Sequence, residues 1–283
     1  MIRYKIANCT TSVSVAKFPD GDVKIDINVG SKDPDPQVKH VCVIVALQGS
    51  DDVMALLQTV DALRRHYPYA DLSLDIPYFP YARQDRPCVN GEALSALVMA
   101  NLINSCGFVT VKVLDAHSDV VPALIKNCTN VSQAKMFKKI FDTYGNFYIV
   151  APDAGAYKKA HNLAKDIGAK GVICANKVRD PATGRIERVS ISENIQGLNL
   201  LVADDLCDGG RTFTELANVL RKGGCASLQL VVTHGLFTKG VQVLLDDGMY
   251  DKVFTTNSYH YQASGNVDQN GVVHDKVQWV KVL

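Results

Sequence analysis

The chain has 283 residues, of which 47% are hydrophobic and 21% charged, which is enough for one large or two medium domains. Its formal net charge of +1, from 30 basic and 29 acidic residues, gives no support to a nucleic-acid partner. Its 8 cysteines form no Cys-x-x-Cys pair, which suits reduced thiols in a cytoplasmic protein without a zinc site. No long apolar run occurs, so we expect neither a signal peptide nor a membrane-spanning helix.

The first half of the chain predicts hairpins and then alternating strands and helices. Residues 1–40 carry short alternating runs around a turn at 18–22, a pattern typical of β-hairpins. Apolar residues at helical spacing from Val53 to Leu63 indicate a helix, and a second helix is expected at 92–105. Short apolar runs predict buried strands at 41–47, 72–75 and 109–114.

The second half repeats the alternation of strands and helices. A helix is expected at 132–144, and the tail at 271–283 is expected to form paired strands. Residues 177–188 are rich in charge and predict a flap closed by a turn. Buried strands are expected at 146–151, 171–176, 198–203, 228–232 and 253–256. Alternation of this kind favours an α/β fold with doubly wound parallel sheets.

The segment 198–224 has the most specific pattern in the chain. The apolar run at 198–203 is followed by Asp204, Asp205 and Asp208, a Gly-Gly pair, and then a helix with apolar residues at i, i+3, i+4 and i+7. The backbone N–H groups at a helix N-terminus favour an anion such as phosphate. Carboxylates beside them can accept hydrogen bonds from ribose hydroxyls. The whole unit favours a ribose phosphate site, although solvated caps and an Asp-Gly turn would explain the Asp-Asp pair alone.

Three other strand ends carry polar residues, each with two interpretations. Residues 76–86 combine aromatic residues with Arg, Gln and Asp, which suits either phosphate recognition or simple packing. His117 could touch a metal or a phosphate, or be an ordinary loop residue. Asp153 could hold Mg²⁺ or cap the following helix. The residues by themselves leave these alternatives open.

The loop at 204–212 resembles the phosphoribosyl pyrophosphate loop of phosphoribosyltransferase-fold proteins, usually written DDxxDTGGT. The matching residues are Asp204, Asp205, Asp208, Gly210 and Thr212. Over nearly the whole chain, the motifs and their order resemble the ribose-phosphate pyrophosphokinase family, also called phosphoribosyl pyrophosphate synthetases. Those motifs are IPYFPYARQDR at 76–86, DAHSD at 115–119, APDAG at 151–155 and THG at 233–235.

The resemblance implies a fold and an activity. The fold is α/β, with two phosphoribosyltransferase-like domains at 1–144 and 145–283, each a mainly parallel sheet flanked by helices. The activity is a Mg²⁺-dependent transfer of the β,γ-diphosphoryl group of ATP to the 1-hydroxyl of ribose 5-phosphate. The products are AMP and phosphoribosyl pyrophosphate, a precursor in nucleotide biosynthesis. The implied partners are these small molecules and further copies of the chain, which share the ATP site, with no nucleic acid or membrane.

The resemblance also implies a role for particular residues. Lys177 and Arg179 would be catalytic and lie on the flap. His117 and Asp153 would hold Mg²⁺. ATP would be bound by Phe18, Asp20, Asp22, Arg83, Gln84, Asp85 and His117. The ribose phosphate would be bound by Asp204, Asp205, Asp208, Gly209, Gly210, Arg211 and Thr212.

The chain departs from the family pattern at several positions. Gly209 stands where the family has Thr, Arg211 where it usually has Gly, and Asp22 where it has Glu. Residues 87–91 lack the family's basic residues and the segment after Asn28 lacks its RGxDVF run, so a hexamer and control by phosphate or ADP do not follow from the resemblance.

The departures in the loop suggest a second candidate acceptor. Loss of bulk at Gly209 and gain of charge at Arg211 would suit a larger 5-substituted ribose such as ADP-ribose, with a role in NAD metabolism. If Arg211 instead points to solvent, the backbone alone would still bind ribose 5-phosphate. An inactive regulatory homologue is a further alternative, and the retained Lys177 and Arg179 argue against it.

Overall fold

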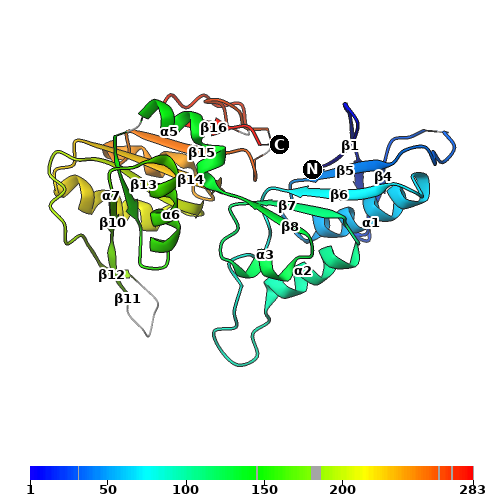
Figure 1. Cartoon of the computed structure of the whole chain (residues 1–283), viewed down its shortest axis with the longest axis horizontal. Helices are drawn as coiled ribbons and strands as arrows, with labels where there is room; N and C mark the ends of the chain where they lie inside the picture. The colour runs from blue at the N-terminus through cyan, green and yellow to red at the C-terminus, as the bar shows by residue number, and fades with distance from the viewer. Residues whose placement is uncertain (31, 145, 180–185, 261, 269, 283) are drawn as a thin grey trace. The chain divides into compact units, whose positions relative to one another are not determined.

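The structure is a computed structural model that describes residues 1–30, 32–144, 146–179, 186–260, 262–268 and 270–282 (Figure 1). At residues 144, 177–179 and 186–188 the description extends to the backbone only. The chain divides into two compact units, a first that ends at Val131 and a second that runs from Ser132 to Val282. Within the described part of the chain, no helix combines the length and apolar character that crossing a membrane requires.

The first unit contains a mixed sheet and a separate hairpin. Its elements are β1 (Ile2–Ile6), β2 (Cys9–Ser12), β3 (Ser14–Lys17), β4 (Val23–Asp26), β5 (His40–Val45), α1 (Ser50–His66), β6 (Asp71–Ile76), α2 (Ser95–Ser105), β7 (Thr110–Leu114), α3 (Val120–Leu124) and β8 (Cys128–Val131). The sheet has the order β2-β1-β5-β6-β7-β8, and β3 pairs with β4 alone. Strands β5 to β8 are parallel, whereas β1 is antiparallel to both of its neighbours.

The parallel strands of the first unit are apolar because helices cover them. Val41, Val43 and Val45 of β5 are fully buried, and Leu56 and Leu63 of α1 belong to the same core. Helix α1 also has acidic residues in its first turn and basic residues in its last turn, an arrangement that the helix dipole favours. The predicted strands and the first predicted helix are therefore confirmed.

The second unit contains a parallel sheet and the flap hairpin. Its elements are α4 (Gln133–Met136), α5 (Lys138–Tyr144), β9 (Tyr148–Ala151), α6 (Tyr157–Ile167), β10 (Val172–Cys174), β11 (Asn176–Arg179), β12 (Ile186–Ser190), β13 (Asn199–Cys207), α7 (Arg211–Lys222), β14 (Ser227–Gly235), the 3-10 turns η1 (Val241–Leu244) and η2 (Asp246–Gly248), β15 (Lys252–Thr256) and β16 (Val277–Val280). The sheet has the order β10-β9-β13-β14-β15-β16 and its strands are parallel throughout. The predicted apolar face of α7 is confirmed, since Phe213, Leu216, Ala217 and Leu220 are buried.

The helix expected at 132–144 is instead two short helices. Phe137 lies between α4 and α5 with non-helical backbone angles, φ −99° and ψ 14°. Its ring is fully buried in the second unit together with Phe141 and Phe147. Because these aromatic side chains pack on the second sheet, the helices belong to the second unit, and the division between units falls before Ser132 rather than after Tyr144.

Three other expectations about single elements differ from the structure. Helix α2 begins at Ser95 rather than at residue 92, because the Glu92 carboxylate accepts the N–H groups of Cys88 (2.6 Å) and Val89 (3.2 Å) and holds a turn there. The tail contributes one strand, β16, which pairs with β15, where paired strands within the tail were expected. Strand β8 was not predicted, since its Cys-Thr-Asn-Val sequence has no apolar alternation.

The packing of Phe137 predicts a measurable loss of stability in the second unit. We expect Phe137→Ala to lower the free energy of unfolding by about 3–5 kcal/mol, as large core truncations do. Trp279 is the only tryptophan and is buried in the second unit, so its fluorescence during urea unfolding reports on that unit. Lys138→Ala, at an exposed neighbouring position, is the matched control. Equal unfolding curves for Phe137→Ala and the wild type would contradict the assignment of α4 and α5.

Candidate active site

Candidate site residues occur in both units. In the second unit, β13 does not end before the acidic pair as the sequence suggested. It continues through Asp204 and Asp205 to Cys207, because β14 extends alongside it and pairs Leu206 with His234 and Cys207 with Gly235. The two carboxylates therefore lie on a strand rather than in a turn, and they are close enough to interact with each other.

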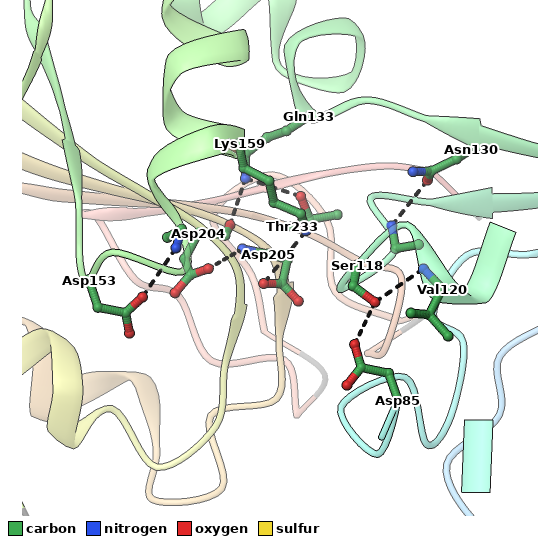
Figure 2. A network of polar contacts seen from close by, with 12 residues as sticks. Asp85, Ser118, Val120, Asn130, Gln133, Asp153, Lys159, Asp204, Asp205 and Thr233 are labelled. Carbon is green, nitrogen blue, oxygen red and sulfur yellow. Dashed lines mark hydrogen bonds and ion pairs between the residues drawn. The ribbon is translucent and has the colours of Figure 1, made fainter. Parts of the chain in front are cut away.

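Asp204 and Asp205 are held by contacts from several elements (Figure 2). The backbone N–H of Asp205 donates to the Asp204 carboxylate at 2.8 Å. The Nζ atom of Lys159, on α6, lies 3.8 Å from the carboxylate of Asp205, which is 5% exposed. Gln133 donates to the carbonyl oxygen of Asp204 (2.7 Å) and to the hydroxyl of Thr233 (3.2 Å). These contacts fix the backbone from which both carboxylates project.

The environment of Asp204 disfavours its charged form. Burial raises the pKa of this carboxyl well above its usual range, and the neighbouring Asp205 carboxylate raises it further. The Asp205 N–H and the Lys159 ammonium act in the opposite direction but are weaker. The pair is therefore ready to accept hydrogen bonds or a cation, since either would relieve the repulsion between the two carboxyl groups.

The rest of the predicted phosphate loop follows β13 directly. Gly210 is the N-cap of α7 and has φ 79°, a left-handed conformation that favours glycine. A Cβ atom there would lie 3.1 Å from Val243 and 3.3 Å from Leu244, so the turn also packs tightly. The N-terminus of α7 begins at this turn, and the helix dipole favours an anion there.

Asp208 is anchored by the segment that follows β14. The Thr238 hydroxyl donates to its carboxylate at 2.7 Å, and the Thr238 N–H donates to its carbonyl at 3.2 Å.

Arg211 does not face the turn as an unpaired cation, because its guanidinium donates to Glu215 one helical turn away at 2.6 Å. Burial raises the pKa of the Cys207 thiol to about 12, so this thiol stays protonated at neutral pH.

Asp153 lies at the end of β9, in the turn that leads into α6. One of its carboxylate oxygens, Oδ1, accepts the N–H of Ala156 at 3.1 Å. Asp153 is not the N-cap of α6, which is Ala156. Its bond instead holds the turn before the helix and uses one oxygen, so the second oxygen remains available to a cation. Within the described residues, no group of three or more His, Cys, Asp and Glu side chains could enclose a metal ion. Mg²⁺ needs only one or two carboxylates where substrate phosphates supply the other ligands.

Lys177 and Arg179 lie on β11, which pairs with β12 to form the predicted flap hairpin. The register shifts between Val178 and Arg179, so the pairing is irregular between the two basic positions. Residues 180–185 of the flap lie outside the described residues, as do the side chains of Lys177 and Arg179.

In the first unit, the aromatic loop and the His117 loop emerge at the same edge of the sheet. They follow β6 and β7, which are parallel neighbours with Ile76 opposite Val113. The Ser118 hydroxyl donates to the Asp85 carboxylate at 2.6 Å and joins the two loops (Figure 2). His117 is half-buried beside this bond.

The aromatic loop has both buried and exposed residues. Phe79 and Ala82 are buried in the core, and the N–H of Ala96 donates to the Gln84 carbonyl at 3.1 Å. Arg83 and Gln84 are exposed. Packing thus anchors the loop and leaves its polar side chains accessible to a ligand.

The hairpin of β3 and β4 presents Phe18, Asp20 and Asp22 in one tight turn. The N–H of Phe18 donates to Asp22 (2.8 Å), and the N–H of Gly21, with φ 99°, donates to Phe18 (2.9 Å). The Phe18 ring is 51% exposed. An aromatic side chain on a rigid exposed turn is suited to contact a second molecule.

Sequence reasoning missed several residues that position the site. Gln133, Lys159, Ser118 and Thr238 each contact a predicted site residue. Ser118 lies within the DAHSD motif but was given no role, and the other three belong to none of the motifs. Gln133 is 71 positions from Asp204, so no local pattern could have connected them. For Thr238 the only signal was its place shortly after the THG motif.

Comparisons with known proteins agree with this arrangement. Residues 2–107 match the model of the N-terminal domain of ribose phosphate pyrophosphokinase, and residues 127–268 match the phosphoribosyl transferase domain. The ribose-phosphate pyrophosphokinase of Hyphomonas neptunium is 30% identical over 254 residues, which cover 88% of this chain and 79% of that protein. The enzyme of that name from Aquifex aeolicus is 29% identical over 255 residues, with the same coverage of both chains.

A likeness in fold supports the match in sequence. The crystal structure of phosphoribosylpyrophosphate synthetase from Mycobacterium smegmatis aligns with a TM-score of 0.80. The alignment covers 98% of this chain and 88% of that chain, at 21% identity. The two-unit architecture is therefore that of a known fold.

The raised pKa of Asp204 predicts that charging this group costs stability. Between the ordinary value of 3.8 and the higher folded value, the folded chain binds more protons than the unfolded chain, so the free energy of unfolding falls as pH rises through that window. Asp204→Asn keeps the oxygen that accepts the Asp205 N–H and removes the charge. We expect the variant to be more stable than the wild type at about pH 8, with a smaller difference at about pH 5.

Urea unfolding followed by Trp279 fluorescence measures this difference in the second unit. Asp166→Asn, at an exposed position of α6, is the control and should leave stability unchanged at both pH values. A variant at position 204 that is less stable than the wild type at about pH 8 would refute the argument.

Proposed function

The chain belongs to the ribose-phosphate pyrophosphokinase family, and we propose that it transfers the β,γ-diphosphoryl group of ATP to the 1-hydroxyl of ribose 5-phosphate. The observation that supports this function best is the acceptor loop of the second unit, which we define as residues 204–212. It combines two neighbouring carboxyl groups on β13, of which Asp204 has a raised pKa, with the N-terminus of α7. The carboxyl groups can accept hydrogen bonds from the ribose hydroxyls, and the N–H groups can bind the 5-phosphate. The loop therefore matches both ends of ribose 5-phosphate.

In this proposal the acceptor loop orients the sugar. Asp204 and Asp205 accept hydrogen bonds from the ribose hydroxyls, which relieves the repulsion between the two carboxyl groups. The N–H groups of Gly209, Gly210 and Arg211 bind the 5-phosphate, where the helix dipole favours negative charge. Thr212 adds a hydroxyl donor, and Asp208 fixes the loop through its bond to Thr238.

The first unit would supply the nucleotide site. Arg83 is exposed at the end of the aromatic loop and suits the phosphates of ATP, because its guanidinium can bind two oxygens at once. Gln84 lies beside it, and Asp85 holds the His117 loop through Ser118. Phe18, with Asp20 and Asp22, would reach the adenine of ATP on a second copy of the chain, so we propose a homo-oligomer with shared nucleotide sites.

The transfer needs positioning and charge stabilisation more than covalent help from the protein. The oxygen of the 1-hydroxyl forms a bond to the β-phosphorus and loses its proton, and the bond from that phosphorus to the oxygen of the α-phosphate breaks to release AMP. Lys177 and Arg179 of the flap would stabilise the negative charge that develops on the oxygens. The Cys207 thiol, protonated at neutral pH, has no part as a nucleophile.

Mg²⁺ fits the residues that the resemblance assigns to it. Asp153 keeps one carboxylate oxygen available at a strand end, and such a carboxylate suits a hard cation that is shared with phosphates. When bound, Mg²⁺ neutralises phosphate charge and holds the diphosphate in one geometry. The resemblance also assigns His117, in the first unit, to this ion.

The larger acceptor suggested by the sequence gains no support from Arg211. Its guanidinium is engaged by Glu215 along the surface of α7, and its side chain is 65% exposed. Arg211, the residue that suggested ADP-ribose, therefore forms a surface ion pair instead. We accordingly propose ribose 5-phosphate as the acceptor.

The proposed reaction is tested by incubating the protein with ATP, Mg²⁺ and ribose 5-phosphate. We expect AMP and phosphoribosyl pyrophosphate in equal amounts, identified by mass and by ³¹P spectra. Lys177→Ala and Arg179→Ala should each reduce kcat by about 10²–10³-fold with little change in the KM for ATP, because their contacts form in the transition state.

Wild-type protein that forms no AMP under these conditions would support the inactive homologue instead. Turnover at the wild-type rate in both variants would leave the reaction standing and refute the role of the flap. Lys170→Ala, at an exposed position outside β11 and β12, is the control and should keep full activity.

Asp153→Asn separates the metal-binding role from the capping role. The Asn side chain can still accept the Ala156 N–H, but it lacks the charge that attracts Mg²⁺. We expect the Mg²⁺ concentration for half-maximal activity to rise about tenfold or more, while thermal stability without Mg²⁺ stays the same. An unchanged Mg²⁺ dependence would show that Asp153 only caps the turn.

A further inference from the structure

The segment that follows β14 is docked on the acceptor loop by its backbone. The N–H groups of Leu236 and Phe237 both donate to the carbonyl of Cys207, at 2.9 and 3.2 Å. Thr238 then bonds to Asp208 twice, through its N–H at 3.2 Å and its hydroxyl at 2.7 Å. Residues 236–238 therefore have a fixed place beside the loop that is proposed to bind the acceptor.

This segment, which we call the 235–240 turn, is also internally rigid. The N–H of Gly240 donates to the carbonyl of Phe237 at 2.7 Å. Phe237 and Gly240 have φ angles of 47° and 79°, which close the turn. The Phe237 ring folds back over Gly235, where an added Cβ would clash with the ring. The backbone of Lys239 is thus held in one position by bonds on both sides.

The side chain of Lys239 lies against the acceptor loop at Gly209. The Cδ, Cε and Cγ atoms of Lys239 would be 3.5, 3.6 and 3.7 Å from a Cβ atom built at that glycine. The family loop has a threonine at this position, and the outer atoms of a threonine would compete with the lysine stem for the same space. Because Gly209 has no side chain, the stem of Lys239 can pack beside the loop.

Among the cations near the acceptor loop, Lys239 differs from the others in its partners. Arg211 is paired with Glu215 at 2.6 Å, and Lys159 lies 3.8 Å from Asp205. Lys239 is exposed, and within the described part of the chain no carboxylate pairs with its ammonium group. It is a cation on a rigid turn, next to N–H groups that favour an anion, with its charge uncompensated.

We propose that Lys239 binds the anionic 5-substituent of the acceptor and replaces the threonine that the family has at position 209. This inference rests on the proposed function and adds a residue to the phosphate end of its acceptor site. The ligand chemistry is a phosphomonoester on the 5-carbon of ribose, which the ammonium and the loop N–H groups bind together. Lys239 thus selects for charge at the 5-position and has no role in the transfer step itself.

The test compares Lys239→Gln with the wild type. We expect the KM for ribose 5-phosphate to rise about tenfold or more, as the loss of a hydrogen bond between charged groups predicts, while kcat and the KM for ATP stay within about twofold. Lys239→Arg should keep most of the affinity because it keeps the charge. Lys222→Gln, at the opposite end of α7 and also exposed, is the matched control and should behave like the wild type.

A second variant tests the exchange between positions 209 and 239. Gly209 has no positive φ, and a Cβ there makes only ordinary contacts, so a threonine can be accommodated. We expect Gly209→Thr combined with Lys239→Gln to recover part of the affinity lost in Lys239→Gln. Calorimetric binding of ribose 5-phosphate without ATP gives the same comparison independently of turnover, and Trp279 fluorescence confirms that each variant is folded.

The outcomes separate the inference from the proposed function. If wild-type protein forms AMP from ATP and ribose 5-phosphate, and Lys239→Gln has an unchanged KM and an unchanged affinity, the inference is wrong and the function stands. If the wild type neither binds nor uses ribose 5-phosphate, the proposed function fails and the inference fails with it. A loss of affinity in Lys239→Gln that increases with decreasing salt supports the inference.

Discussion

The site in the second unit depends on the pairing of β13 with β14 through their carboxyl ends. That pairing extends β13 as far as Cys207 and so places Asp204 and Asp205 on a strand, in an environment that raises the pKa of Asp204. A water-exposed turn would have hydrated the same two carboxyl groups at no cost. The structure therefore keeps a locally unfavourable arrangement in the place where a ligand can relieve it, and such sites commonly exchange stability for function.

The surrounding contacts explain why this arrangement persists. Gln133, on the short helix α4, bonds to the Asp204 carbonyl and to Thr233, and thereby joins neighbouring strands at their carboxyl ends. Thr233 is fully buried, and its carbonyl accepts the hydroxyl of Thr256 at 2.7 Å, so the network continues to β15. A buried network in which the groups satisfy one another holds rigid the backbone from which both carboxylates project.

In the first unit, buried apolar residues hold the candidate site loop in place. Phe79 and Ala82 enter the core, and the Asp85–Ser118 bond joins two loops, so that Arg83 and Gln84 lie at the surface without depending on a long flexible segment. The packing interpretation of this loop is thus confirmed, and the binding interpretation stays a prediction. Buried residues anchor the loop, and Arg83 and Gln84 beside them stay exposed.

Local patterns in the sequence determined the α/β class, most of the strands, the buried face of α7 and the family resemblance, because these features depend on periodicity and on motifs of adjacent residues. Tertiary structure decided the rest. Packing of Phe137 broke one predicted helix and moved its pieces to the second unit, and pairing with β14 extended β13 through the acidic residues. The partners of the charged groups were also decided in three dimensions. Arg211 pairs with Glu215. Lys239 lies against Gly209, which is 30 positions away in the sequence, because the 235–240 turn docks on the acceptor loop. Contacts between residues so far apart depend on how the strands are ordered in the sheet, and no local pattern in the chain specifies that order.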